Sequence, residues 1–236
     1  MPVIFRRRAT DRPAEPSSDA VETDELEELQ QDRPRGPWDR DETKLDEQQD
    51  GYIDLGGLVV RGVEGIELRL QVEDQEGTIA AVMLAGPDAG LEVRAFAAPR
   101  NGGIWDEVSK DIAAEAVRRG GTATEVDGEF GTELTLSVPV DLPDGRQAVQ
   151  PSRIVGVEGP RWLLRGTFLG RSALQPDPEG ALESAFRDVI VVRGNEPMAP
   201  RDMIAMRMPP QAQAQIVAEA QAQAEAPGDE PDAEQP

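Results

Sequence analysis

Apolar and polar residues alternate along the middle of the chain. Between positions 66 and 72, every second residue is apolar, and the residues between them are charged or polar. A period of two is typical of a strand with one buried face. The stretch 78–84 is apolar on both faces, which predicts a central strand, and 91–97 predicts a third strand beside it.

A different period begins after Asn101-Gly102-Gly103. From Ile104 to Val117 the apolar residues recur at spacings of three and four, with charged residues between them. That spacing predicts an amphipathic helix over 104–118. Gly120 and Gly121 follow, as glycines commonly do at the C-terminal end of a helix.

The second half of the folded region returns to strands. Strands are predicted at 122–126 and 134–140, and 158–160 predicts a hairpin between strands 154–157 and 161–168. Asp177 and Pro178 resemble the cap and first residue of a short helix, which a last strand at 189–192 follows. The sequence therefore predicts an α+β fold. We expect a mostly antiparallel sheet with two helices packed on one face, in two layers, flanked by disordered arms.

The apolar pattern also divides the chain. Residues 1–35 and 211–236 combine net negative charge with few apolar side chains, so we expect two disordered arms, the second rich in Ala, Gln and Pro. Residues 36–210 remain as a single domain. Composition alone assigns 36–50 to the disordered arm.

Composition removes several kinds of chemistry. The chain carries 46 acidic and 24 basic residues, a formal net charge of −22, so we expect neither nucleic acid nor anionic lipid to bind it. It has no histidine and no cysteine, which excludes the commonest catalytic base, the thiolate nucleophile and the commonest metal ligands. We expect no cofactor and no metal. Without an apolar run long enough to span a bilayer or an export signal, the expected location is the cytoplasm.

Catalytic patterns are equally sparse. The turn 101–103 precedes a helix and could hold an anion on backbone amides, but the lysine of a phosphate loop is missing. A glycine-containing cap explains that turn better. A hydrolase using two carboxylates would need a pocket in which buried acids converge, and spacing alone does not single out any pair.

Two segments are candidate binding surfaces. Alternation in a strand over 161–165 places Arg161, Leu163 and Arg165 on one face, which gives a small basic patch. Four of the six methionines fall within 198–208, and Met203, Met206 and Met208 would suit an adaptable protein surface. The alternative for the methionines, which the sequence favours, is that this segment packs across the domain's own core.

Several longer blocks of the sequence resemble one uncharacterised actinobacterial family, catalogued as domain of unknown function 3710. The resemblance runs from about Gly36 to Met208. The blocks that carry it are Gly36–Asp39, Ala97–Arg100, Gly102–Val108, Phe130–Leu134, Gly159–Gly166 and Phe186–Val189. It implies a Gram-positive, high-GC source and an intracellular protein, and it supplies no activity or ligand. It also implies that Gly36–Asp39 docks on the domain, with Trp38 as the aromatic anchor.

Two main hypotheses of function follow. The first is a non-catalytic protein-binding module, an adaptor or small chaperone-like protein, with an unidentified protein partner. The second is an accessory factor in nucleotide or nucleic-acid metabolism that binds a small anionic ligand at 101–104 and the nearby arginines. The carboxylate-only hydrolase is a third and weaker alternative. The sequence does not indicate the oligomeric state.

Overall fold

The fold was analysed in a computed structural model, which describes residues 36–43, 51–72, 78–141 and 145–208. The two predicted disordered arms, 1–35 and 211–236, lie outside the described residues. None of the described helices is long and apolar enough to cross a membrane.

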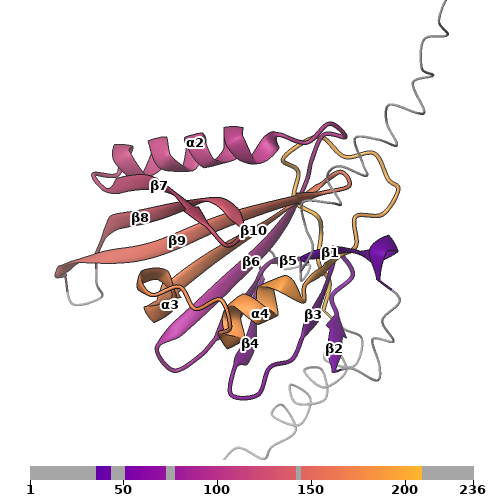
Figure 1. Ribbon diagram of the computed structural model, residues 1–236, viewed down its shortest axis with the longest axis horizontal. Helices are drawn as coiled ribbons and strands as arrows, with labels where there is room; N and C mark the ends of the chain where they lie inside the picture. Colours follow the sequence, from indigo (N-terminus) through magenta and orange to yellow (C-terminus); the bar gives the residue numbers. More distant parts are fainter. Residues whose placement is uncertain (1–35, 44–50, 73–77, 142–144, 209–236) are drawn as a thin grey trace, which may run out of the picture.

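A seven-stranded antiparallel sheet forms the centre of the domain (Figure 1). Its strand order is β4-β5-β6-β10-β9-β8-β7, so each strand neighbours the next in sequence except where β10 lies beside β6. The strands are β4 (Glu67–Val72), β5 (Ile79–Ala85), β6 (Ala89–Ala97), β7 (Thr122–Gly128), β8 (Gly131–Asp141), β9 (Gln147–Gly159) and β10 (Trp162–Gly170). The sequence patterns predicted every one of these strands, although several are longer than expected.

A second, smaller sheet was not predicted. Its order is β1-β11-β3-β2, and the pair β1–β11 is parallel. The strands are β1 (Trp38–Asp39), β2 (Tyr52–Asp54), β3 (Leu58–Arg61) and β11 (Ile190–Val191), with a 3₁₀ turn, η1 (Arg40–Glu42), after β1. Only β11 was predicted, as a strand at 189–192. The other three strands have two to four residues, too few for a period of two to show in the sequence.

The helices lie on opposite faces of the large sheet, which differs from the expected two-layer arrangement. Helix α2 (Ile104–Arg118) packs over β7, β8 and β9, whereas α4 (Ala181–Arg187) and the small sheet cover the other face (Figure 1). A short helix, α3 (Arg171–Leu174), directly follows β10. The sheet is therefore the middle of three layers.

The central strand β10 shows why both faces are covered. Leu163 is buried beneath α2, and its neighbours Trp162 and Leu164 are buried in the opposite core. Successive side chains of a strand point to opposite faces, so a run of apolar residues needs a packing layer on each side. The two helices therefore cannot share one face.

Three predicted boundaries also move. Helix α4 begins at Ala181 and not at Pro178, because the Gly180 N–H bonds to the Asp177 carbonyl in a turn before the helix. Strand β10 begins at Trp162, since Arg161 stands in the hairpin turn with φ +62°. Strand β7 ends at Gly128, two residues beyond the predicted 126, because Gly128 still pairs with Gly131 of β8.

Residues 36–43 dock on the domain through an acid and an indole. The buried Asp39 carboxylate accepts a 2.7 Å hydrogen bond from the Trp162 indole N–H, and the Trp38 N–H donates to the Val189 carbonyl. Burial raises the pKa of Asp39, while hydrogen bonds from the Asp41 N–H and Trp162 act in the opposite direction. Asp39 is thus more deeply buried than Trp38, the anchor that the family resemblance implies.

Candidate functional site

A cavity of about 550 Å³ lies between helix α2 and the large sheet. Its lining is predominantly apolar and comes from one face of α2 and from strands β6, β8, β9 and β10. The apolar lining residues are Phe96, Ile104, Val108, Ile112, Ala116, Leu136, Val138, Val140, Ile154, Leu163 and Leu169. Such a concave, mainly apolar site is the usual form of a ligand pocket.

Short side chains on both sides account for the space. On α2, Val108, Ile112 and Ala116 face the sheet, and opposite them Ser152 and Thr167 also line the cavity. None of these side chains is long enough to fill the gap between a helix and a sheet. The large aromatic on this helix, Trp105, lies at its N-terminal end, where its indole N–H donates to the Thr132 carbonyl at 2.7 Å.

Arg165 is a partly buried charged group of the cavity, and it has no carboxylate within hydrogen-bond distance. Its guanidinium lies over the Phe96 ring, 5.3 Å from the ring centroid, and both residues line the cavity. The nearest carboxylate, Glu92, is 3.9 Å away and is already held by Arg94 at 2.8 Å. The Arg165 Nε atom is buried without a hydrogen-bond partner among the described residues. Burial, followed by the positive charge of Arg94, lowers the pKa of Arg165, and Glu92 partly offsets this.

A second arginine fixes the segment beside α2. Arg201 lines the cavity and forms ion pairs with Glu107 at 3.1 Å and Asp111 at 2.9 Å, both on α2. Its φ of +74° lies in the left-handed region, an uncommon conformation for a residue with a side chain. The two ion pairs hold the chain against the helix that roofs the cavity.

The start of α2, predicted as a place for a small anion, is occupied by the chain itself. The Trp105 backbone N–H donates a 2.7 Å hydrogen bond to the Glu158 carboxylate. An internal acid thus interacts with the positive end of the helix dipole. An anionic ligand at 101–104 would have to displace Glu158, so the structure disfavours that site.

Two buried glutamates converge on one arginine on the other side of the sheet. Arg153 donates to Glu133 at 3.2 Å and to Glu183 at 2.5 Å, and all three residues are almost fully buried. The guanidinium also donates to the Ser172 carbonyl and lies 4.0 Å above the Phe168 ring. Neither carboxylate lines the cavity beneath α2. These contacts indicate a structural cluster rather than the acid–base pair of a hydrolase.

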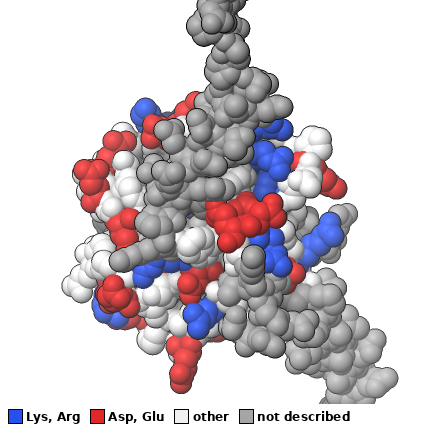
Figure 2. All heavy atoms as spheres, turned by 45° about the vertical axis from the view of Figure 1, so that its right-hand side comes forward, with Lys and Arg blue, Asp and Glu red and all other residues white. Residues whose placement is uncertain are grey.

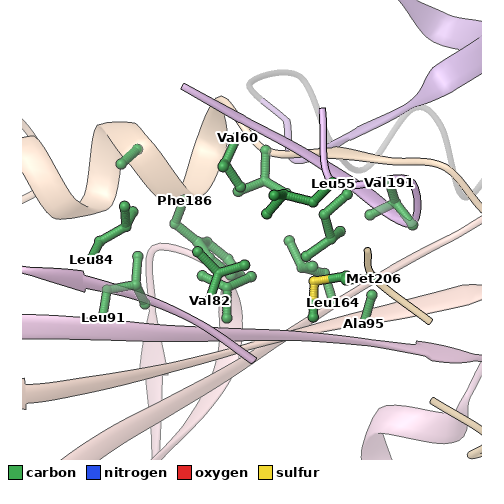
Figure 3. Close-up of a cluster of buried hydrophobic side chains, with 14 of the residues drawn as sticks. Leu55, Val60, Val82, Leu84, Leu91, Ala95, Leu164, Phe186, Val191 and Met206 are labelled. Carbon is green, nitrogen blue, oxygen red and sulfur yellow. The ribbon is translucent and has the colours of Figure 1, made fainter. Parts of the chain in front are cut away.

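The methionine segment packs on its own domain. Ile204 N–H donates to the Ala95 carbonyl, and Met206 forms a bridge with Ile79, so the segment extends the hydrogen bonding of β6 and β5. Met206 is fully buried and points into the core beside Leu164 (Figure 3). Met203 and Met208 are half-buried. A partner surface required all three methionines to be exposed, and Met206 does not meet that condition.

Replacing Met206 should therefore affect stability. We expect Met206→Ala to lower the free energy of unfolding by about 2–5 kcal/mol, because it leaves a cavity in a packed core. The half-buried Met208→Ala is the control, and it should cost clearly less. Urea unfolding followed by circular dichroism measures both. Equal, small losses would show that Met206 is not held in the core.

Of the five candidate residues, only Arg165 reaches the cavity. Arg161 lies in the β9–β10 turn, where its guanidinium donates to the Gly194 carbonyl. The basic patch expected from these two arginines does not form. The sequence did contain a signal for the cavity, since Leu163, Arg165, Thr167 and Leu169 alternate along β10. The sequence did not show that α2 covers this face of β10.

Residues 36–215 match the family model described as "Protein of unknown function (DUF3710)". The chain belongs to this family. The match covers the whole described part of the chain, so the cavity, the Arg153 cluster and the methionine segment all lie within the DUF3710 region. Comparison with curated proteins finds no match to this chain. The resemblance seen in the sequence is thereby confirmed as to family.

Proposed function

We propose that this DUF3710 protein is a non-catalytic binding module whose binding site is the cavity between α2 and the large sheet. The observation that carries the proposal is the size of this largely apolar cavity, which lies beside the packed core of α2 and the large sheet. The domain's own side chains do not cover the apolar surface of the cavity. A ligand that covers it removes this surface from water, which favours binding.

The distribution of charge on the domain also makes a small or apolar molecule a better candidate ligand than nucleic acid. Most arginines of the described residues form ion pairs with nearby carboxylates, for example Arg61 with Asp188, Arg171 with Asp88 and Arg187 with Glu129. On the face shown in Figure 2, the described basic and acidic side chains are interspersed and form no extended basic area. That the protein binds no nucleic acid stays a prediction.

An adaptor or chaperone-like role also stays a prediction. The methionine surface on which it relied is not available at Met206, and the cavity is the site that we propose for such a role instead. In that case an apolar side chain of a protein partner would occupy the space beneath α2. A nucleotide-binding role has less support, because Glu158 occupies the start of α2.

A neutral fluorescent dye tests whether the cavity takes ligands. Nile red should bind to the full-length protein with increased emission, because its apolar rings move from water into the apolar cavity. Thr167→Phe places a ring in the cavity from β10 and should abolish most of this emission. Thr167→Val, which keeps the volume of threonine, should leave it unchanged.

Thermal melts must show that both Thr167 variants are folded. Nile red emission that Thr167→Phe does not reduce would place the dye elsewhere and remove the cavity from the account. An absence of dye binding by the unmodified protein would count equally against the proposed function.

A further inference from the structure

The ionised residues of the cavity are not balanced. Its lining contains three arginines, Arg119, Arg165 and Arg201, and two acids, Asp111 and Glu115. Both acids already have partners: Asp111 pairs with Arg201, and Glu115 pairs with Arg118. Arg119 and Arg165 are thus left without a close carboxylate among the described residues, and Arg119 is exposed to solvent. The formal net charge of the whole protein, in contrast, is −22.

Arg165 is the less exposed of these two arginines. Its side chain is 22% exposed, its Nε atom has no partner among the described residues, and Glu92 is too distant for a hydrogen bond. A buried donor without a partner is unfavourable, and a ligand that supplies an acceptor removes this cost. The planar guanidinium matches a carboxylate, which can accept two parallel hydrogen bonds from it.

We propose that the cavity binds an amphipathic monocarboxylate, with its carboxylate on Arg165 and its unbranched apolar tail between α2 and strands β8–β10. This inference rests on the proposed function, since it names the ligand class for the same cavity. The partly buried guanidinium of Arg165 fits one negative charge, whereas the other arginine without a close carboxylate, Arg119, is exposed to solvent. A doubly charged phosphate would need further donors, and a cationic amphiphile would face Arg165 directly.

The cavity is large enough for the tail. A water molecule occupies roughly 30 Å³ in the liquid, so a volume of about 550 Å³ equals that of about eighteen water molecules, more than a chain of ten carbons needs. The lining along the tail would be Val108, Ile112, Leu136, Val138 and Leu163. Each methylene buried there should raise affinity about fourfold, so affinity should increase with chain length.

Three ligands with the same tail test the inference on the full-length protein. Decanoate, decanol and decyltrimethylammonium are titrated by calorimetry below their micellar concentrations. We expect decanoate to bind at least about tenfold more tightly than decanol, because only the carboxylate carries a negative charge and can accept two parallel hydrogen bonds from the guanidinium. The cationic amphiphile should bind most weakly.

The variant Arg165→Met separates the contribution of the carboxylate to the affinity from that of the tail. Methionine matches the aliphatic stem of arginine but has no charge, so the variant should reduce decanoate affinity to about that of decanol and should affect decanol affinity much less. Arg171→Met is the matched control, since Arg171 is exposed, pairs with Asp88 and does not line the cavity. It should change the affinity for neither decanoate nor decanol.

The outcomes distinguish the two proposals. If decanol and decanoate bind equally to the unmodified protein, the cavity binds apolar ligands but the carboxylate inference is wrong. If Arg165→Met keeps the preference for decanoate, the carboxylate lies elsewhere and the inference is again wrong. If none of the three ligands binds, the proposed function itself fails.

Discussion

Arg153→Met should lower the free energy of unfolding by about 3–5 kcal/mol, because it leaves two carboxylates buried without a counter-ion. Glu133 and Glu183 are each about 2% exposed, and both depend on this guanidinium. Each carboxylate has one further contact, a backbone N–H from Phe130 for Glu133 and from Asp177 for Glu183. These two hydrogen bonds cannot replace a full positive charge.

Chemical denaturation of three variants, each compared with the unmodified protein, measures this loss of stability. Arg171→Met, which breaks an exposed ion pair, should cost less than about 1 kcal/mol. Adding Glu133→Gln and Glu183→Gln to Arg153→Met should restore part of the loss, because the buried charges are then absent. If Arg153→Met is as mild as Arg171→Met, the buried cluster contributes little to the stability of the fold.

Trp105→Ala should destabilise the domain by a similar amount, about 3–5 kcal/mol, since it removes the largest side chain between α2 and the sheet. The ring packs directly over Gly156 of β9, where any added Cβ would overlap it. The same change also removes the hydrogen bond from the indole to Thr132. Trp105→Phe, which keeps a ring but loses the donor, should cost less.

Gly156 provides the second half of this test. Gly156→Ala alone should be strongly destabilising, because its methyl group and the indole compete for one space. In the Trp105→Ala background the same substitution should cost far less, a coupling that a double-mutant cycle measures. A melting temperature for Trp105→Ala within about two degrees of the unmodified protein would show that the ring is not part of the core.

The sequence predicted the strands of the large sheet and helix α2 because each carries a regular period. Helix 104–118 was predicted with the residues that the structure shows. Periodicity cannot show on which face of the sheet a helix packs. The strand that contains Trp162 and Leu164 was interpreted as having one basic face, whereas the structure buries apolar side chains on both of its faces.

The candidate site was predicted much less well. Arg165 was selected as part of a basic patch, yet its neighbours in space are Phe96 and α2, which are distant in sequence. The Arg153 cluster joins three strand and helix residues across 50 positions of the chain. Asp39 finds Trp162 across an even longer separation. Such contacts depend on strand order, which no local pattern contains.

The central claim is that the cavity beneath α2 holds an apolar ligand, and methyl NMR tests it most directly. On titration with decanol, the methyl signals of Ile112, Val138 and Leu163 should shift, because these side chains line the cavity. The signals of Leu84 and Val191, in the core on the other face, should remain in place. Shifts confined to the second group, or no shifts at all, would contradict the account.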